Sequence, residues 1–134
     1  MPSFESIANT CRSRLATQVA IPYSYPVLYD NAPEPAFTDL WLRATMQFGR
    51  TNIVELGGSK NTYRTSGVFL VQVRIPIQLG DRSALIAADR IALAFRSVNQ
   101  SGVTFRSPSV DPYGRDGSWW LVNVQCPFFS DEVA

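Results

Sequence analysis

The side chains best suited to catalysis are a few dispersed acids, and the sequence contains no histidine. The absence of histidine excludes Ser-His and Cys-His nucleophiles, histidine-ligated zinc and the usual general base near neutral pH. A chance pairing of two acids in space stays open, but we expect the acids at strand ends, in loops or on the outer side of a helix, where solvation or capping explains them. These acids are Glu55, Asp89, Asp111 and Asp116.

The two cysteines and the glycine-bearing loops also lack the spacing of a reactive site. Cys11 lies within an apolar helical stripe, and Cys126 is far from it in the sequence, so neither belongs to a metal-binding motif. Gly57-Gly58 precedes Lys60, but no hydroxyl residue follows that lysine as it would in a phosphate-binding loop. The sequence therefore predicts no catalytic residue, no cofactor and no metal site, with two structural thiols in a reducing compartment.

The polar faces of the predicted strands are the most informative feature. They hold Gln, Asn, Thr and Arg but no carboxylate, whereas solvated sheet faces usually mix Lys, Glu and Thr. Such a face is typical of a subunit interface or of a pore lining that meets a polyanion; an exposed face that merely lacks acids is the alternative. The candidate interface or lumen residues are Trp41, Arg43, Gln47, Gln72, Arg74, Gln125 and Arg64, with the loop acids Asp111 and Asp116 as partners from a neighbouring subunit.

Hydrophobic periodicity predicts two helices and several strands that position these residues. Apolar stripes at helical spacing lie near 3–20, where Pro22 should end the helix, and near 81–99. Alternation predicts strands at 40–48, 52–56, 68–79 and 118–126, and a short edge strand at 27–29 within the proline-rich segment 22–37. We expect one α+β domain over 1–134, a mostly antiparallel sheet with both helices on one face. The expected core includes Leu42, Met46, Val71, Val73, Ile75, Ile91 and Phe95.

Composition narrows the class of partner. The 134 residues are 46% hydrophobic and 17% charged, with a net charge of +1, which excludes a binder that grips nucleic acid by phosphate neutralisation alone. All but one of the 12 basic residues are arginine, which favours pairing at partly desolvated interfaces; a GC-rich genome is the alternative explanation. No apolar run is long enough to cross a membrane or to serve as a signal peptide, so we expect no membrane partner.

The order of several residues resembles the tail terminator proteins of long-tailed, lambda-like phages. The resemblance covers about residues 1–98. After an N-terminal helix it runs through Tyr29-Asp30-Asn31, Pro33, Trp41, Gly57-Gly58, Arg64, Gly67, Val71-Gln72-Val73, Pro76, Gly80, Ala88-Asp89-Arg90-Ile91 and Phe95. The ordered set carries the resemblance, because none of these short motifs is specific alone.

The resemblance implies a structural virion protein without enzymatic activity or cofactor. It implies a homo-oligomeric ring, usually a hexamer, that caps the tail tube protein, stops its polymerisation and offers a surface to the head completion or connector protein. DNA would pass through the lumen of that ring without sequence-specific binding. The protein would then lie in the virion, at the head-proximal end of the tail, after assembly in the host cytoplasm.

Two other classes of protein stay open. One is a different neck component, such as a head–tail connector or a tail tube subunit; a tube subunit normally has a long hairpin loop, for which the segment 60–67 is short. The other is a small enzyme or ligand-binding module, against which the missing histidine and the weak motifs argue.

Overall fold

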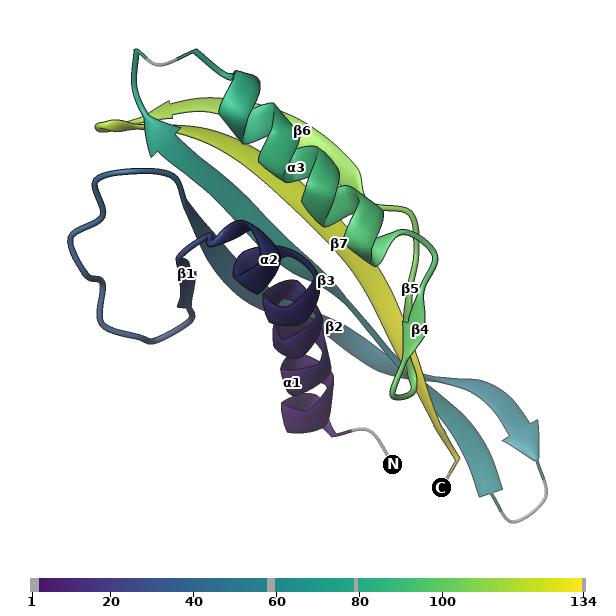
Figure 1. Ribbon diagram of the computed structural model, residues 1–134. Coiled ribbons are helices and arrows are strands. Elements are labelled where there is room, and N and C mark those ends of the chain that lie inside the picture. Colours follow the sequence, from purple (N-terminus) through teal and green to yellow (C-terminus); the bar gives the residue numbers. More distant parts are fainter. Residues whose placement is uncertain (1–2, 58–59, 79, 134) are drawn as a thin grey trace.

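A single twisted sheet of seven strands forms the body of the protein (Figure 1). The computed structural model describes residues 3–57, 60–78 and 80–133. The strand order is β1-β2-β3-β7-β5-β4, with β6 paired to β7 as well, and every pair is antiparallel except β1 with β2. The strands are β1 (Val27–Tyr29), β2 (Trp41–Gly57), β3 (Lys60–Pro76), β4 (Asn99–Gln100), β5 (Val103–Phe105), β6 (Ser109–Asp116) and β7 (Trp119–Val133). The predicted α+β class with a mostly antiparallel sheet is confirmed.

The N-terminal helix is longer than predicted. It begins as α1 (Phe4–Leu15), where Ser3 and Ser6 exchange side-chain-to-backbone hydrogen bonds in a capping box. It continues through a π-helical turn (Ala16–Ala20) into α2 (Ile21–Tyr23). Pro22 does not end it: it directly follows the π-helical turn, where Ile21 donates its N–H to the carbonyl of Ala16 and the regular i→i−4 pattern is already interrupted, and the helix runs one residue further. The left-handed Ser24 ends it instead.

The second helix, α3 (Arg82–Phe95), is shorter than the predicted 81–99. Arg96 leaves the helix with extended backbone angles, and the next residues form the small strand β4. Leu85 donates its backbone N–H to the carbonyl of Asp81, which opens the first turn. Val98, which continues the helical spacing of apolar residues in the sequence, therefore lies in the connection between α3 and β4 and not in the helix.

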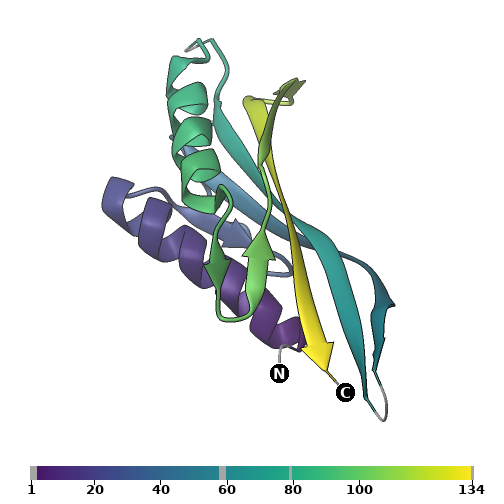
Figure 2. The same cartoon turned by 90° about the vertical axis from the view of Figure 1, so that its right-hand side faces the viewer.

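Both helices lie on the same face of the sheet (Figures 1 and 2). The hydrophobic core lies between the helices and this face. Phe95 is fully buried and packs its ring against Phe69 and Phe105, with ring centroids 5.6 and 5.0 Å away. Of the predicted core, only Met46 is half-buried, and it still packs against the cluster. The opposite face, which no helix covers, is called the outer face below.

Several strand predictions were wrong in extent. Asp111 and Asp116, expected in a loop, lie on a strand, β6, which also contains Pro112. A proline fits there because β6 is an edge strand, where a missing N–H donor need not break the ladder. The two runs at 40–48 and 52–56 form one strand, since bulges after Phe48 and Ile53 absorb the break in alternation. Residues 60–67, expected as part of a loop, belong to β3.

The ribbon of β2 and β3 extends beyond the helices and forms an arm (Figure 2). We define the arm as residues 49–57 of β2 and 60–66 of β3. Gly67 lies at its base, opposite Phe48 and Phe128. A Cβ at this position would collide with the backbone oxygen of Gln47 and would lie 2.7 Å from Cζ of Phe128, so only glycine fits.

Phe95→Ala should lower the free energy of unfolding by about 3–5 kcal/mol, because it leaves a cavity among two other aromatic rings. Leu93→Ala is the matched control on the same helix; its side chain is exposed, so the change should stay within about 0.5 kcal/mol. Urea unfolding followed by circular dichroism measures both. Equal effects of the two substitutions would contradict the position of α3 on the sheet.

Native alkylation of the thiols should be slow. Cys11 and Cys126 are fully buried, and this burial raises the pKa of Cys11 to about 12 and also raises the pKa of Cys126. A thiol with a raised pKa holds almost no reactive thiolate near neutral pH. Mass spectrometry after iodoacetamide treatment should find both thiols unmodified in the folded protein and both modified in urea. Rapid native modification of either would show that the core opens at that cysteine.

Candidate assembly surface

All nine candidate site residues lie on the outer face of the sheet. Side chains alternate between the two faces of a strand, and the strand register carries that alternation from β2 through β3 and β7 to β6. The nine residues are Trp41, Arg43 and Gln47 on β2, Arg64, Gln72 and Arg74 on β3, Gln125 on β7, and Asp111 and Asp116 on β6. The structure thus places on one face the residues that alternation had assigned strand by strand, and β6 adds the two acids that were expected in a loop.

At one end of this face, the guanidinium of Arg74 interacts with side chains of the same chain. Its Nη1 lies 3.5 Å from Oδ2 of Asp116, and its Nη2 donates a 3.1 Å hydrogen bond to Oε1 of Gln72. The guanidinium also lies over the ring of Trp41, 5.3 Å from the centroid. Trp41 is itself buried, because the ring of Phe37 stacks on it. It therefore packs against Arg74 but is not accessible to a partner.

The middle of the outer face is a polar surface that spans four strands. Arg43, Gln72, Asn123 and Asp111 occupy one row across β2, β3, β7 and β6. The two ends of the row are exposed, and the two amides between them are half-buried. Gln125, in the next row of the same face, and Gln47, one row further, are also exposed. Amide and guanidinium groups therefore dominate the accessible part of this surface.

At the far end, Arg64 pairs with Asp131 on β7. Two hydrogen bonds of 2.8 and 2.9 Å join the guanidinium to both carboxylate oxygens. The hydrogen bonds lower the pKa of Asp131 and raise that of Arg64. The ring of Phe129 lies 4.2 Å from the Arg64 guanidinium carbon and 4.6 Å from that of Arg106. This bidentate pair links β3 to β7 at the base of the arm.

These contacts correct the expectation that the strand arginines lack acids of their own. Because β6 is a strand, it brings Asp111 and Asp116 to the margin of the face, where a loop would not have fixed them. Asp116 and Asp131 pair with arginines of the same chain, so a neighbouring subunit need not supply them. Of the face's predicted arginines, Arg43 has no acidic partner among the residues described here. The face is consequently close to electrically neutral.

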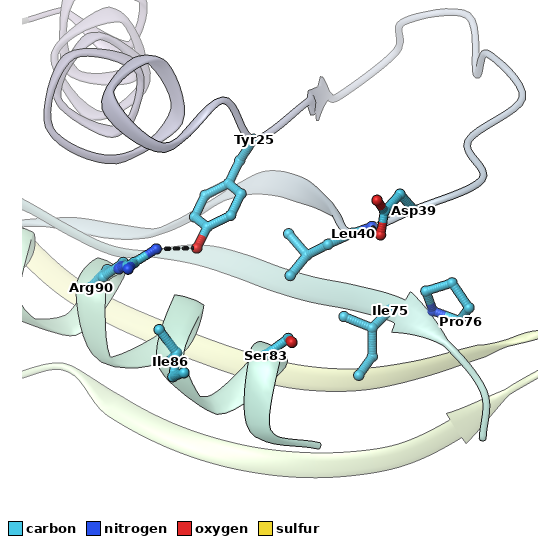
Figure 3. A pocket seen from close by; sticks show the side chains of 8 residues that line it. All are labelled: Tyr25, Asp39, Leu40, Ile75, Pro76, Ser83, Ile86 and Arg90. Atoms are coloured by element: carbon cyan, nitrogen blue, oxygen red, sulfur yellow. Dashed lines mark hydrogen bonds between the residues drawn. The ribbon is translucent and has the colours of Figure 1, made fainter. Parts of the chain in front are cut away.

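A groove that no sequence pattern indicated lies on the helical side, near the start of β2 and the end of β3 (Figure 3). It has a volume of about 340 Å³. Arg90 of α3 reaches across it, donates a 2.7 Å hydrogen bond to the hydroxyl of Tyr25 and lies over the ring of Tyr23. The lining residues are Tyr25, Asp39, Leu40, Ile75, Pro76, Ser83, Ile86 and Arg90. They come from three distant segments, which is why no local motif marks the groove.

Within residues 3–57, 60–78 and 80–133, no three potential metal ligands cluster together. The same residues include no helix with the length and apolar character needed to cross a membrane.

Comparison with known proteins is consistent with a structural role in phage tails. The phage tail terminator protein family matches residues 6–128. One solved structure of unstated function is 24% identical, with a TM-score of 0.70 over 97% of this chain and 96% of that one. A chain from the virion of a native gene transfer agent particle is 13% identical, with a TM-score of 0.58 over 98% of this chain and 100% of that one. No curated protein sequence matches the chain.

The two structural likenesses share the fold, and the family match extends through both helices and almost the whole sheet. The protein is a member of the phage tail terminator family and a structural protein of the phage tail.

Proposed function

We propose that the protein forms a closed ring that caps the tail tube, stops the addition of tube subunits and offers the surface to which the DNA-filled head is joined. The match to the tail terminator family over residues 6–128 carries this proposal. The ring consists of copies of this chain, six in the usual terminator, and it meets the tube protein on one side and a head completion protein on the other. It needs no cofactor and performs no catalytic step.

The outer face of the sheet is suited to line the lumen of that ring. Two of its arginines are neutralised by acids of the same chain, and its accessible centre combines two amides, Gln47 and Gln125, with one arginine and one aspartate, Arg43 and Asp111. A strongly basic lining would bind phosphates and hold the DNA, because each neutralised phosphate adds to the affinity. A strongly acidic lining would repel the DNA. A nearly neutral polar lining lets the duplex pass.

A tail tube subunit is the second candidate, and one observation removes an argument against it. The segment 60–67 alone is short for the long hairpin of a tube protein, but β2 and β3 are each 17 residues long and end in the arm. The family match still favours the terminator. Copy number separates the two, since a tube subunit repeats along the tail and a terminator does not.

Loss of the protein should leave tube growth unchecked. In phage that lack the gene, we expect tubes of variable and excessive length without heads, and purified protein added to growing tubes should stop their elongation. Electron microscopy of negatively stained lysates measures the tube lengths. Tubes of normal length that remain headless would show that the protein joins the head but does not end polymerisation.

Arg43→Glu should lower the titre of infectious phage by about tenfold or more while the protomer keeps its melting temperature, because each copy in the ring adds a negative charge to the DNA path. Arg43 is preferred to Arg74 for this test, since glutamate at position 74 would face Asp116 and disturb the protomer itself. Complementation of a phage that lacks the gene measures the titre.

Two variants control this experiment. Arg43→Lys keeps the charge and should complement fully. Arg96→Glu makes the same charge change at an exposed position just after α3, away from the outer face, and should also complement. A normal titre with Arg43→Glu, or an equal loss with Arg96→Glu, would contradict a lumen position for the outer face.

A further inference from the structure

The arm carries apolar side chains that the described part of the protomer leaves exposed. The row of β2 that faces the core continues past the end of the helices through Phe48, Ile53 and Leu56, and exposure rises along it from 39% to 51% to 79%. Val54, at the second bulge, is exposed as well. Phe48, at the base of the arm, still contacts the ring of Phe4 in α1, with the centroids 4.8 Å apart. The ribbon then continues beyond the helices (Figures 1 and 2), and its twist turns the arm out of the plane of the sheet body.

The groove lies at the opposite end of the same ribbon. Trp41 pairs with Arg74 beside the groove, and Gly57 pairs with Lys60 at the tip of the arm. Sixteen residue steps of strand separate these two ends, which corresponds to about 50 Å. Leu40, Ile75 and Ile86 supply apolar walls to the groove. The arm of one molecule therefore cannot fill its own groove.

The groove itself is lined by one acid and one basic residue, Asp39 and Arg90, and Arg90 is already engaged with Tyr25 and Tyr23. The charge difference between the groove end and the arm therefore comes from the residues around them. The segment 16–42, which borders the groove, contains three exposed acids and no basic residue; the acids are Asp30, Glu34 and Asp39. The arm carries three basic residues, Arg50, Lys60 and Arg64, and a single acid, Glu55; Arg64 is paired with Asp131, so the exposed Arg50 and Lys60 give the arm its excess positive charge. Complementary potentials favour the encounter of the arm with the groove end and disfavour contact between two arms.

We propose that the arm of each copy docks in the groove of the next copy around the ring, with Leu56 and Ile53 against Ile86 and Leu40. The contact joins two different surfaces, so it repeats head to tail and closes into a ring when the rotation per copy divides a full turn. The proposal rests on the ring proposed above and names the contact that holds it. An arm that grips its neighbour also explains why a tail protein exposes three large aliphatic side chains on one hairpin.

A disulfide cross-link tests the contact directly. Leu56→Cys and Ile86→Cys are introduced together, and tails assembled with this variant are treated with a mild oxidant. The two positions lie far apart in one chain, while a disulfide needs Cα atoms within about 7 Å, so only a neighbouring copy can supply the partner. The natural thiols are buried and should not react. We expect a ladder of covalent multimers on a non-reducing gel.

The control replaces the half-buried groove position, Ile86, with an exposed leucine of the same helix. Leu56→Cys with Leu93→Cys should remain monomeric on the gel, because Leu93 lies outside the groove. One outcome is that the test pair does not cross-link in tails that have normal length and carry a terminal ring. In that case the proposed arm contact is wrong, while the proposed ring is supported. Protection of the introduced thiol at position 56 from alkylation without a cross-link would assign the arm to another tail protein and overturn the contact. If no ring is present on the tails, both proposals fall.

A substitution gives an independent readout. Leu56→Asp should reduce the number of completed tails about tenfold or more, as loss of a central apolar contact does, without a change in the melting temperature of the protomer. Leu93→Asp, at a leucine of similar exposure, should complete tails normally. Full complementation by Leu56→Asp would overturn the proposed contact.

Discussion

The apolar face of the sheet is longer than the helices that cover it, and this mismatch shapes the rest of the molecule. Helices α1 and α3 bury the half of the β2–β3 ribbon that carries Leu42, Val71 and Phe69. Beyond Phe48 the same row of β2 continues without a helix above it. The protomer therefore has a stable core at one end and an apolar arm at the other. A chain built this way gains from association with a further protein, because burying that arm removes apolar surface from water.

The outer face shows how a sheet can carry arginine without becoming basic. Arg74 and Arg64 are each satisfied by a carboxylate on a neighbouring strand, at opposite ends of the face. Such partly exposed pairs contribute little to stability, but they fix the direction of long side chains and cancel their charge. The amide-rich centre then determines what the face presents to DNA or to another subunit. Charge cancellation within the protomer is consistent with a surface that touches a polyanion without holding it.

Much of the fold could be predicted because its signals are local. Helical periodicity identified both helices, and alternation identified most of β2, β3 and β7, including which residues face outward. The errors arose where the structural context decides: Pro22 is tolerated directly after a π-helical turn, Pro112 is tolerated on an edge strand, and two bulges make one long strand look like two runs. The ion pairs and the groove join residues more than 35 positions apart in the chain, so no sequence pattern could reveal them.

The central claim is that this member of the terminator family acts as one ring at the end of the tail tube. Electron cryomicroscopy of the head–tail junction in intact phage tests it most directly. The account predicts a single closed ring of this chain between the last tube ring and the head-joining protein, with Arg43 and Gln125 facing the DNA channel. Density for this chain repeated along the length of the tube, or its absence from the junction, would contradict the account.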